Sequence, residues 1–244
     1  MNVKFGVGIN KVALLRNARG RDVPNIVEAA KLLISAGCEV IKIHQWEDNR
    51  HILLRDIYSL SEIDEIKSGK VLLNVGGTIR KYLLEVVKEC EVHQFTITPF
   101  KKEELTTQKG WDHNDSKNEL LMLNDYFQKK TKIIIFVDAK IEDVDFAKSM
   151  NADGIEINCR EYVNYFDDEN KRNQILETIL KVSTYAKSLE LEVHLAHDLD
   201  IIKIEPLIKM IKPEQITVGH TFIAESLLEG IPLAAKKYKD IFKF

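Results

Sequence analysis

The stretch HQWEDNRHI, residues 44–52, gathers side chains that can do chemistry directly after an apolar run, EVIKI. It contains two histidines seven residues apart, an adjacent pair of acids, an arginine and a tryptophan. The apolar run predicts a strand, so His44 would end that strand and His51 would lie in the loop that follows. Imidazole titrates near neutral pH, so histidines at such a position can donate or accept protons in catalysis.

Histidines recur at the ends of two other apolar runs. His197 ends LEVHLAH and is followed by Asp198, and His220 follows QITVG. We interpret His44 and His197 as acid–base partners, because they fall at equivalent positions. A metal site from His194, His197 and Asp198 is disfavoured, since residues three apart on a strand point to opposite faces. We therefore expect no metal and no other cofactor.

The elements that would position these side chains follow a regular order. Short runs rich in β-branched residues alternate with segments of helical periodicity, which predicts βαβ units and a parallel sheet. Eight such units in 244 residues are typical of a single (β/α)8 TIM barrel over residues 1–244. A doubly wound sheet is the alternative, but GVGINKVA after the first strand lacks its G-x-G-x-x-G pattern. Strands are expected at 4–9, 39–44, 71–75, 93–98, 132–137, 154–158, 191–197 and 215–220, and helices at 24–36, 55–67, 78–90, 118–128, 143–151 and 173–189.

Composition narrows the class of protein. The net charge of −3 argues against general attraction to nucleic acid, and no stretch of 18 uncharged apolar residues predicts a membrane span. The three cysteines, Cys38, Cys90 and Cys159, are scattered and form no CxxC pair. With no apolar signal segment at the beginning of the sequence, we expect a cytoplasmic protein with reduced thiols.

A barrel also predicts where ligands bind, because its active site lies at the carboxyl ends of the strands. Gly219 and His220, before a predicted helix, are candidates for phosphate binding. The stretch LRNARG, residues 15–20, is predicted to be a loop in which Arg16 and Arg19 either bind an anion or are merely solvated. The long loop 98–112 is either a lid or surface decoration.

Several motifs together resemble the pyridoxine 5′-phosphate synthase family. They are LRNARG, HxxEDxRHI, PxKxEELTT, FVDA, GIEI and VGH…SLLEG, in this order from about residue 6 to residue 231. The resemblance implies a (β/α)8 barrel in a homo-oligomer, an octamer in the family. It implies that small, possibly phosphorylated substrates are joined: 3-amino-2-oxopropyl phosphate condenses with 1-deoxy-D-xylulose 5-phosphate through an imine, dehydration and ring closure. No metal is implied.

The resemblance assigns roles to residues that match the family's motifs. His44 corresponds to the family's base and His197 to its acid. The remaining matches are expected to bind substrate: His51, Arg19, Thr106, Gly219 and His220.

Other positions depart from the family's pattern. Asn10 and Lys11 replace an Asp-His pair, while Gly8 replaces an asparagine. Trp46 replaces an arginine that binds phosphate, Gly76 stands where a catalytic glutamate is expected, and Asp198 replaces a glycine. We expect Asn10, Lys11, Trp46 and Asp198 to contact substrate.

These departures leave three hypotheses. The first is a diverged enzyme that keeps imine chemistry but takes at least one altered substrate, with Lys11 as a candidate amine or anion ligand and otherwise a solvated cation. The second is a working synthase in which Asp198 or Glu156 replaces the missing glutamate. The third is a ligand-binding relative without activity. We favour the first.

Overall fold

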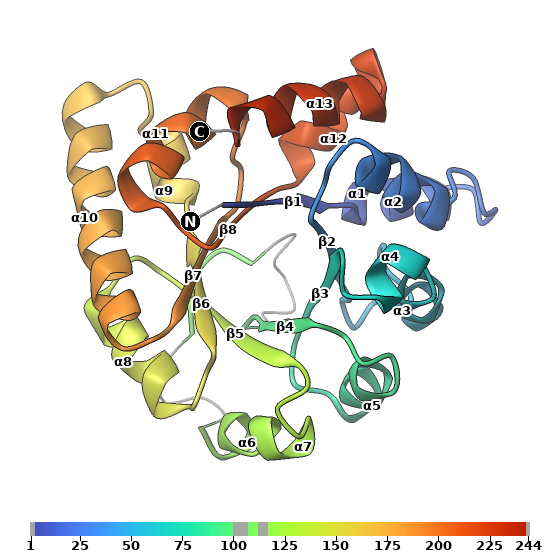
Figure 1. The fold of residues 1–244 in the computed structure, drawn as a ribbon, viewed down its shortest axis with the longest axis horizontal. Coiled ribbons are helices and arrows are strands. Elements are labelled where there is room, and N and C mark those ends of the chain that lie inside the picture. Colours follow the sequence, from blue (N-terminus) through green and yellow to red (C-terminus); the bar gives the residue numbers. More distant parts are fainter. Residues whose placement is uncertain (1–2, 100–106, 112–116, 243–244) are drawn as a thin grey trace.

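A computed structural model describes residues 3–99, 107–111 and 117–242, without the side chains of 117 and 118. Eight parallel strands form a closed barrel in chain order, which confirms the predicted fold. Helices surround the strands (Figure 1). The strands are β1 Lys4–Gly8, β2 Val40–His44, β3 Leu72–Gly77, β4 Gln94–Ile97, β5 Lys132–Val137, β6 Gly154–Asn158, β7 Glu192–Ala196 and β8 Gln215–Val218.

The predicted helices are present, with differences of length and number. The helix predicted over 55–67 is divided at Glu62 and Ile63 into two helices, and the segment 118–128 likewise contains two. A short helix precedes the long helix Glu169–Ser188, and helices not predicted form over Asn10–Asn17, Ile201–Ile211 and Ile231–Ile241. The helices within the described ranges are α1 Asn10–Asn17, α2 Ile26–Ser35, α3 Leu54–Ser61, α4 Asp64–Lys67, α5 Lys81–Glu89, α6 Lys117–Leu121, α7 Leu123–Tyr126, α8 Ile141–Ser149, α9 Arg160–Asn164, α10 Glu169–Ser188, α11 Ile201–Ile211, α12 His220–Glu229 and α13 Ile231–Ile241.

Glycines follow two of these helices. Gly37 follows α2 with a φ of 95°, and Gly69 follows α4 with a φ of 73°. This left-handed backbone strains any residue with a Cβ, so glycine is the residue that allows both turns. Pro24 lies directly before the N-cap Asn25 of α2.

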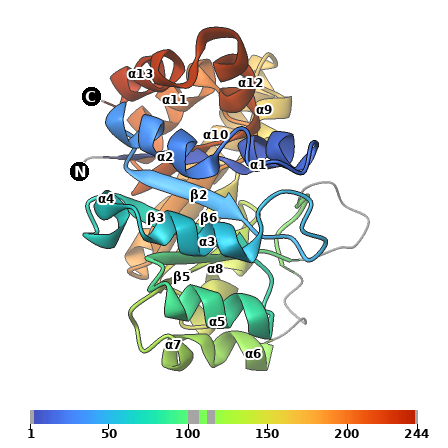
Figure 2. The ribbon, with the colours of Figure 1, turned by 90° about the vertical axis from the view of Figure 1, so that its right-hand side faces the viewer.

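Alternation along the strands separates an outer core from the barrel interior. On β2, Ile41 and Ile43 belong to the hydrophobic core between strands and helices, so Lys42 and His44 face inward. The same alternation on β6 turns Glu156 inward. Figure 2 shows β2 pointing away from the side where both chain ends lie, toward the mouth that carries the loops. The barrel interior below this mouth therefore contains charged and polar side chains.

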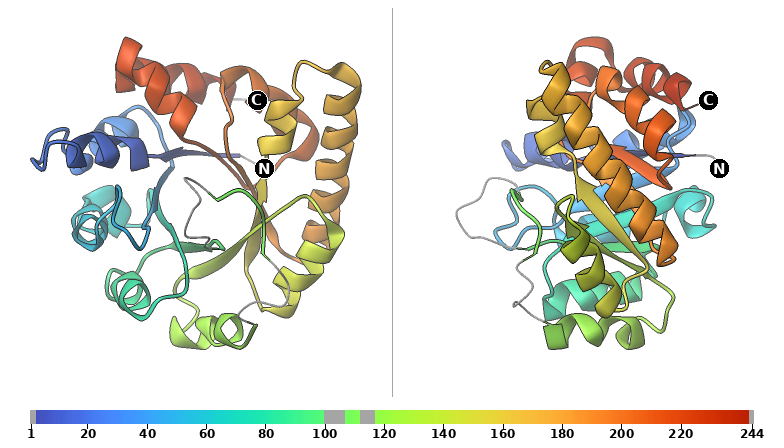
Figure 3. Two further views of the ribbon diagram at one scale, coloured as in Figure 1. Left: turned by 180° about the vertical axis from the view of Figure 1, so that it is seen from behind. Right: turned by 90° about the vertical axis from the view of Figure 1, so that its left-hand side faces the viewer.

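The first and last elements of the barrel pack against each other. Strand β1 pairs with β8, and α13 packs against α2. Figure 3 shows these helices together from behind. Among the described residues, no helix is long and apolar enough to cross a membrane.

Candidate active site

A lysine and a glutamate meet inside the barrel beneath the mouth. Lys42 on β2 donates from Nζ to Oε2 of Glu156 on β6, four strands away. The glutamate side chain is 1% exposed and the lysine side chain 12% exposed. Burial alone would raise the pKa of Glu156, but the Lys42 ammonium, with smaller effects of His197 and His194, lowers it below its ordinary value. Glu156 is thus ionised, and its carboxylate lies inside the barrel beside Lys42.

His44 lies two residues above Lys42 on the same strand, with its backbone fixed by Asn10. The His44 N–H donates to Asn10 Oδ1 at 2.7 Å. Gly76 on β3 leaves the space for the imidazole, since a Cβ at position 76 would lie 2.7 Å from His44 Nδ1. Desolvation lowers the pKa of His44 well below its ordinary value, and the nearby His51 and Lys42 lower it further. His44 is therefore neutral at pH 7.

His197 reaches the same region because the chain leaves the strand pattern directly after β7. Its φ is 80°, followed by 57° at Asp198. The imidazole packs on Phe136 of β5, with ring centroids 4.7 Å apart. Desolvation lowers the pKa of His197 to about 4, although Glu156 partly opposes the shift. Val193 and Leu195 belong to the outer core, so His194 between them faces inward. His197 contacts Phe136, which faces inward by the same alternation on β5, so the expectation that the two histidines face opposite sides is wrong. The positive φ is the reason.

Trp46 forms an aromatic wall beside His44. Its side chain is 6% exposed, and its ring lies 4.8 Å from the His44 ring at an angle of 40°. The guanidinium of Arg50 lies 4.5 Å from the Trp46 ring, and Arg50 also pairs with Asp48. Asp48 thus orients the Arg50 guanidinium on the Trp46 ring and balances its charge.

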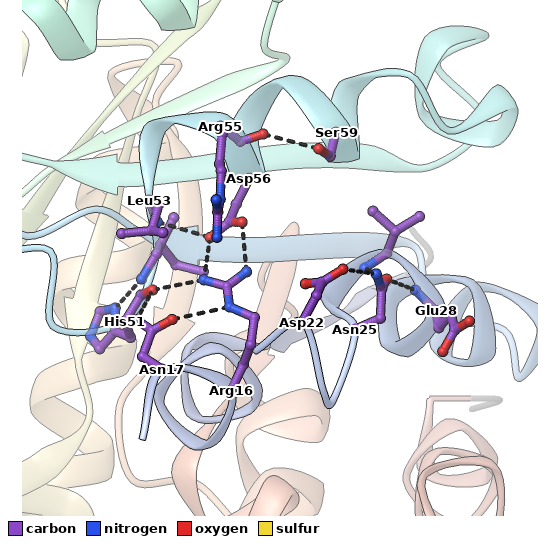
Figure 4. Close-up of polar contacts among 12 residues, drawn as sticks. Arg16, Asn17, Asp22, Asn25, Glu28, His51, Leu53, Arg55, Asp56 and Ser59 are labelled. Atoms are coloured by element: carbon purple, nitrogen blue, oxygen red, sulfur yellow. Dashed lines mark hydrogen bonds and ion pairs between the residues drawn. The ribbon is translucent and has the colours of Figure 1, made fainter. Parts of the chain in front are cut away.

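His51 is held by a buried polar cluster that connects α1 to α3 (Figure 4). Arg16 donates to both oxygens of Asp56, at 2.6 and 2.8 Å, and to the backbone oxygen of His51 at 3.2 Å. Asn17 donates to that same oxygen at 2.7 Å. The Ile52 N–H donates to His51 Nδ1 at 3.0 Å, so the neutral ring carries its proton on Nε2. Desolvation, with Lys11 and Arg50, lowers the pKa of His51 to about 4.

This cluster corrects the prediction for LRNARG. Residues 10–17 form the helix α1, and Arg16 is a buried structural residue at 2% exposure, neither a solvated loop cation nor an anion ligand. Helix α1 has only 8 residues, which are too few for a helical periodicity to be recognised in the sequence. Arg19 follows the helix and is exposed.

Asp198 is neutralised by a neighbouring arginine. Arg160 at the start of α9 donates from Nε to Asp198 at 2.9 Å and from Nη1 to Gln108. Asn158 donates to the Gln108 backbone oxygen at 3.0 Å. The end of the loop 98–112 is thereby attached to β6, next to a pocket of about 650 Å³. Thr106 lies outside the described residues.

Gly219 and His220 lie where the sequence places them, between β8 and α12. Gly219 is the N-cap residue of α12, and His220 is exposed at its first turn. His220 and Lys11 line an apolar groove of about 590 Å³ between α1, α2 and α12. They therefore lie to one side of the His44–His197 pair. Among the residues that the structure describes, no group of three histidine, cysteine or acidic side chains could hold a metal ion.

Two residues of the site were missed or undervalued from the sequence. Lys42 was taken as part of an apolar strand, and Glu156 was considered only as a substitute for the missing glutamate. The available signal was a lysine two residues before His44, on the same face of the strand. Their pairing joins residues 114 apart in sequence, which a strand pattern does not show.

A closed parallel barrel with proton-transfer groups and an ion pair at the carboxyl ends of its strands defines a TIM-barrel enzyme. A family model described as pyridoxal phosphate biosynthesis protein PdxJ matches residues 5–243, and the chain belongs to this family.

Relatives agree with this assignment, and solved structures share the fold. Pyridoxine 5′-phosphate synthase of Coxiella burnetii (strain Dugway 5J108-111) is 32% identical over 240 residues, covering 98% of each chain. That of Sulfurihydrogenibium sp. (strain YO3AOP1) is 30% identical, covering 98% of this chain and 97% of its own. The fold also resembles a tryptophan synthase structure from M. tuberculosis, with a TM-score of 0.69 at 10% identity and coverage of 100% and 94%.

Proposed function

We propose that this enzyme condenses an amino-ketone with a second ketone by imine formation, dehydration and ring closure, and that at least one substrate differs from those of its relatives. The observation that carries the proposal is the convergence of His44, His197 and Glu156 with Lys42 beneath one mouth. Imine formation and dehydration each move protons between nitrogen, carbon and oxygen, and these groups supply acceptors for them.

The lowered pKa values determine how the histidines act. Neutral His44 and His197 accept protons at pH 7. Once protonated, a histidine with a pKa near 4 gives its proton up readily, which suits protonation of a leaving hydroxyl. Glu156 remains ionised and stabilises cationic imine intermediates.

The wall beside His44 supports the altered substrate. Trp46 presents a flat apolar face with one donor, where the resemblance places a phosphate-binding arginine. Arg50 lies over this ring, but its charge is paired with Asp48. A substrate with an apolar or aromatic part fits such a wall better than a second phosphate dianion does.

Genuine pyridoxine 5′-phosphate synthase activity is the second candidate, and two observations favour it. Glu156 supplies an ionised carboxylate inside the barrel, paired with Lys42 on the strand of His44. The Arg160–Asp198 pair, at 2.9 Å, removes much of the repulsion that an isolated Asp198 would exert on phosphate.

One assay separates the candidates. Purified enzyme is incubated with 3-amino-2-oxopropyl phosphate and 1-deoxy-D-xylulose 5-phosphate, and pyridoxine 5′-phosphate is followed by mass spectrometry beside an active relative. The altered-substrate proposal predicts no product above the His44→Ala variant. Product that depends on His44 would overturn it in favour of the second candidate. Binding of unphosphorylated amines or ketones without any turnover would support an inactive, ligand-binding protein.

We also propose that the enzyme is a homo-oligomer. The apolar groove between α1, α2 and α12 is lined by Leu14, Leu15 and Leu227, which are 42%, 52% and 70% exposed. A contiguous apolar surface of this kind is typical of an interface. Lys11 and His220 line the same groove, so a second copy there would enclose the candidate phosphate-binding residues.

A further inference from the structure

We propose that Lys42 is a catalytic nucleophile, whose amine forms a covalent imine with a ketone substrate. The inference rests on the proposed imine chemistry and names the residue that carries out its first step. It transfers to Lys42 the role for which the sequence had suggested Lys11. Lys11 lines the apolar groove with His220, whereas Lys42 lies inside the barrel two residues before His44 and pairs with Glu156.

Geometry is the first support. Lys42 faces the barrel interior two residues below His44, and Glu156 holds its Nζ directly. The Lys42 side chain is 12% exposed, whereas the Glu156 side chain is 1% exposed. His197 contacts Phe136, whose neighbours Ile135 and Val137 belong to the outer core, so His197 reaches the same barrel interior.

Energetics is the second support. Burying an ion pair is costly, and such pairs are often replaceable by apolar side chains without loss of stability. Most other interior positions near the Lys42–Glu156 pair are apolar or neutral, such as Asn74 and Thr96. A lysine in a carbonyl-binding site has a known use, since it forms Schiff bases once it loses a proton.

The step balances with the groups present. The Lys42 ammonium gives one proton to the Glu156 carboxylate, and the free electron pair of Nζ attacks the ketone carbon. The carbonyl electrons move to oxygen, which takes the proton from Glu156. A second proton leaves nitrogen by the same route, water departs, and the C=N bond forms. Ammonium and ketone thus give iminium and water, with Glu156 again a carboxylate.

The iminium then activates the ketone for the second substrate. The amine of the amino-ketone adds to the iminium carbon and Nζ of Lys42 leaves as an amine. Nζ then takes the proton from the new imine nitrogen, which restores the Lys42 ammonium. An iminium carbon is more electrophilic than the ketone itself. This transfer yields the substrate–substrate imine that the condensation requires and regenerates Lys42.

The test traps the intermediate without requiring turnover. Enzyme is mixed separately with hydroxyacetone and with 1-deoxy-D-xylulose 5-phosphate, reduced with sodium borohydride, digested and analysed by peptide mass spectrometry. Reduction converts the iminium into a stable secondary amine. We expect the mass of one reduced ketone on the Lys42 peptide, saturating with ketone concentration, and a loss of at least tenfold in labelling in Lys42→Arg.

The matched control is Lys132→Arg. Lys132 is another strand lysine paired with a glutamate, Glu192, but at the opposite end of its strand. This variant should keep full labelling of Lys42. If Lys42→Arg fails to fold, the double variant Lys42→Met with Glu156→Gln removes the charge pair together and should fold without labelling.

Two outcomes overturn the proposal. One is an unlabelled Lys42 in folded enzyme that binds either ketone. The other is labelling of Lys42 no faster than that of exposed lysines such as Lys67. The result is independent of the proposed function: a labelled Lys42 supports the role of the lysine whether or not a condensation product forms, whereas product without labelling contradicts only the lysine.

Discussion

Burial sets the charge of the histidines in this site. For His197, an ordinary pKa of 6.5 is lowered to about 4 in the folded chain, mainly by desolvation. The unfolded chain therefore binds more protons than the folded one between these values. The contribution of His197 to stability is complete above pH 6.5 and is lost as pH falls toward 4.

This shift predicts a measurable dependence on pH. Between pH 7 and pH 5 the enzyme should lose about 1–2 kcal/mol of unfolding free energy through His197. Over the same pH range, the unfolding free energy of the His197→Gln variant should fall less than that of the wild type, and the difference should equal this contribution. Urea unfolding at both pH values gives the comparison, and nuclear magnetic resonance titration of His197 checks the pKa directly. An NMR pKa near 6.5 would contradict the burial argument.

Gly76 gives a second prediction for single residues. In Gly76→Ala the new Cβ would lie 2.7 Å from His44 Nδ1, so the imidazole must move. We expect a destabilisation of about 1–3 kcal/mol from overpacking. Gly8→Ala is the control, because its Cβ would meet the Val218 oxygen at an ordinary 3.4 Å. Urea unfolding of the two variants tests this, and equal stabilities would count against the packing of His44 in the space of position 76.

At the scale of elements, the Arg16–Asp56 pair joins α1 to α3 and fixes the loop of His51. Its side chains are 2% and 5% exposed, and Asp56 also accepts the Leu53 N–H at the start of α3. Removing one partner leaves a buried charge. Arg16→Ala should therefore cost about 3–5 kcal/mol.

An exposed ion pair supplies the contrast. Lys67 and Glu62 are 64% and 71% exposed, so Lys67→Ala should change stability far less than Arg16→Ala does. Thermal and urea unfolding of both variants measure the difference. Similar costs for the two would show that the buried pair does not connect the helices.

The sequence predicted the strands well because each has an apolar outer face that alternation reveals. It placed His44 at the end of β2 and His197 directly after β7, because strand ends mark the barrel mouth, while their catalytic roles stay predictions. The burial of Arg16 and Lys42 could not be predicted from the sequence, since both are charged side chains that are buried only through partners 40 and 114 residues away. Local pattern assigns such residues to solvent.

At the scale of the whole molecule, the apolar groove predicts self-association. In Leu227→Lys a side chain that is 70% exposed in the single chain becomes charged, so the fold should persist while the assembly dissociates. Sedimentation velocity should show a smaller species. The control is Tyr82→Lys on α5, 72% exposed and outside the groove, which should leave the assembly unchanged. A wild-type monomer would contradict the proposed oligomer.

The packing of His44 against Gly76 also constrains how this sequence can change over generations. A glutamate introduced at position 76 would have its Cβ within 2.7 Å of the imidazole before its carboxylate could do anything useful. The effect of that substitution therefore depends on what has already happened at position 44. A glutamate at position 76 requires the histidine to shift first, so selection meets a loss before any gain, and the glycine is entrenched by its neighbour.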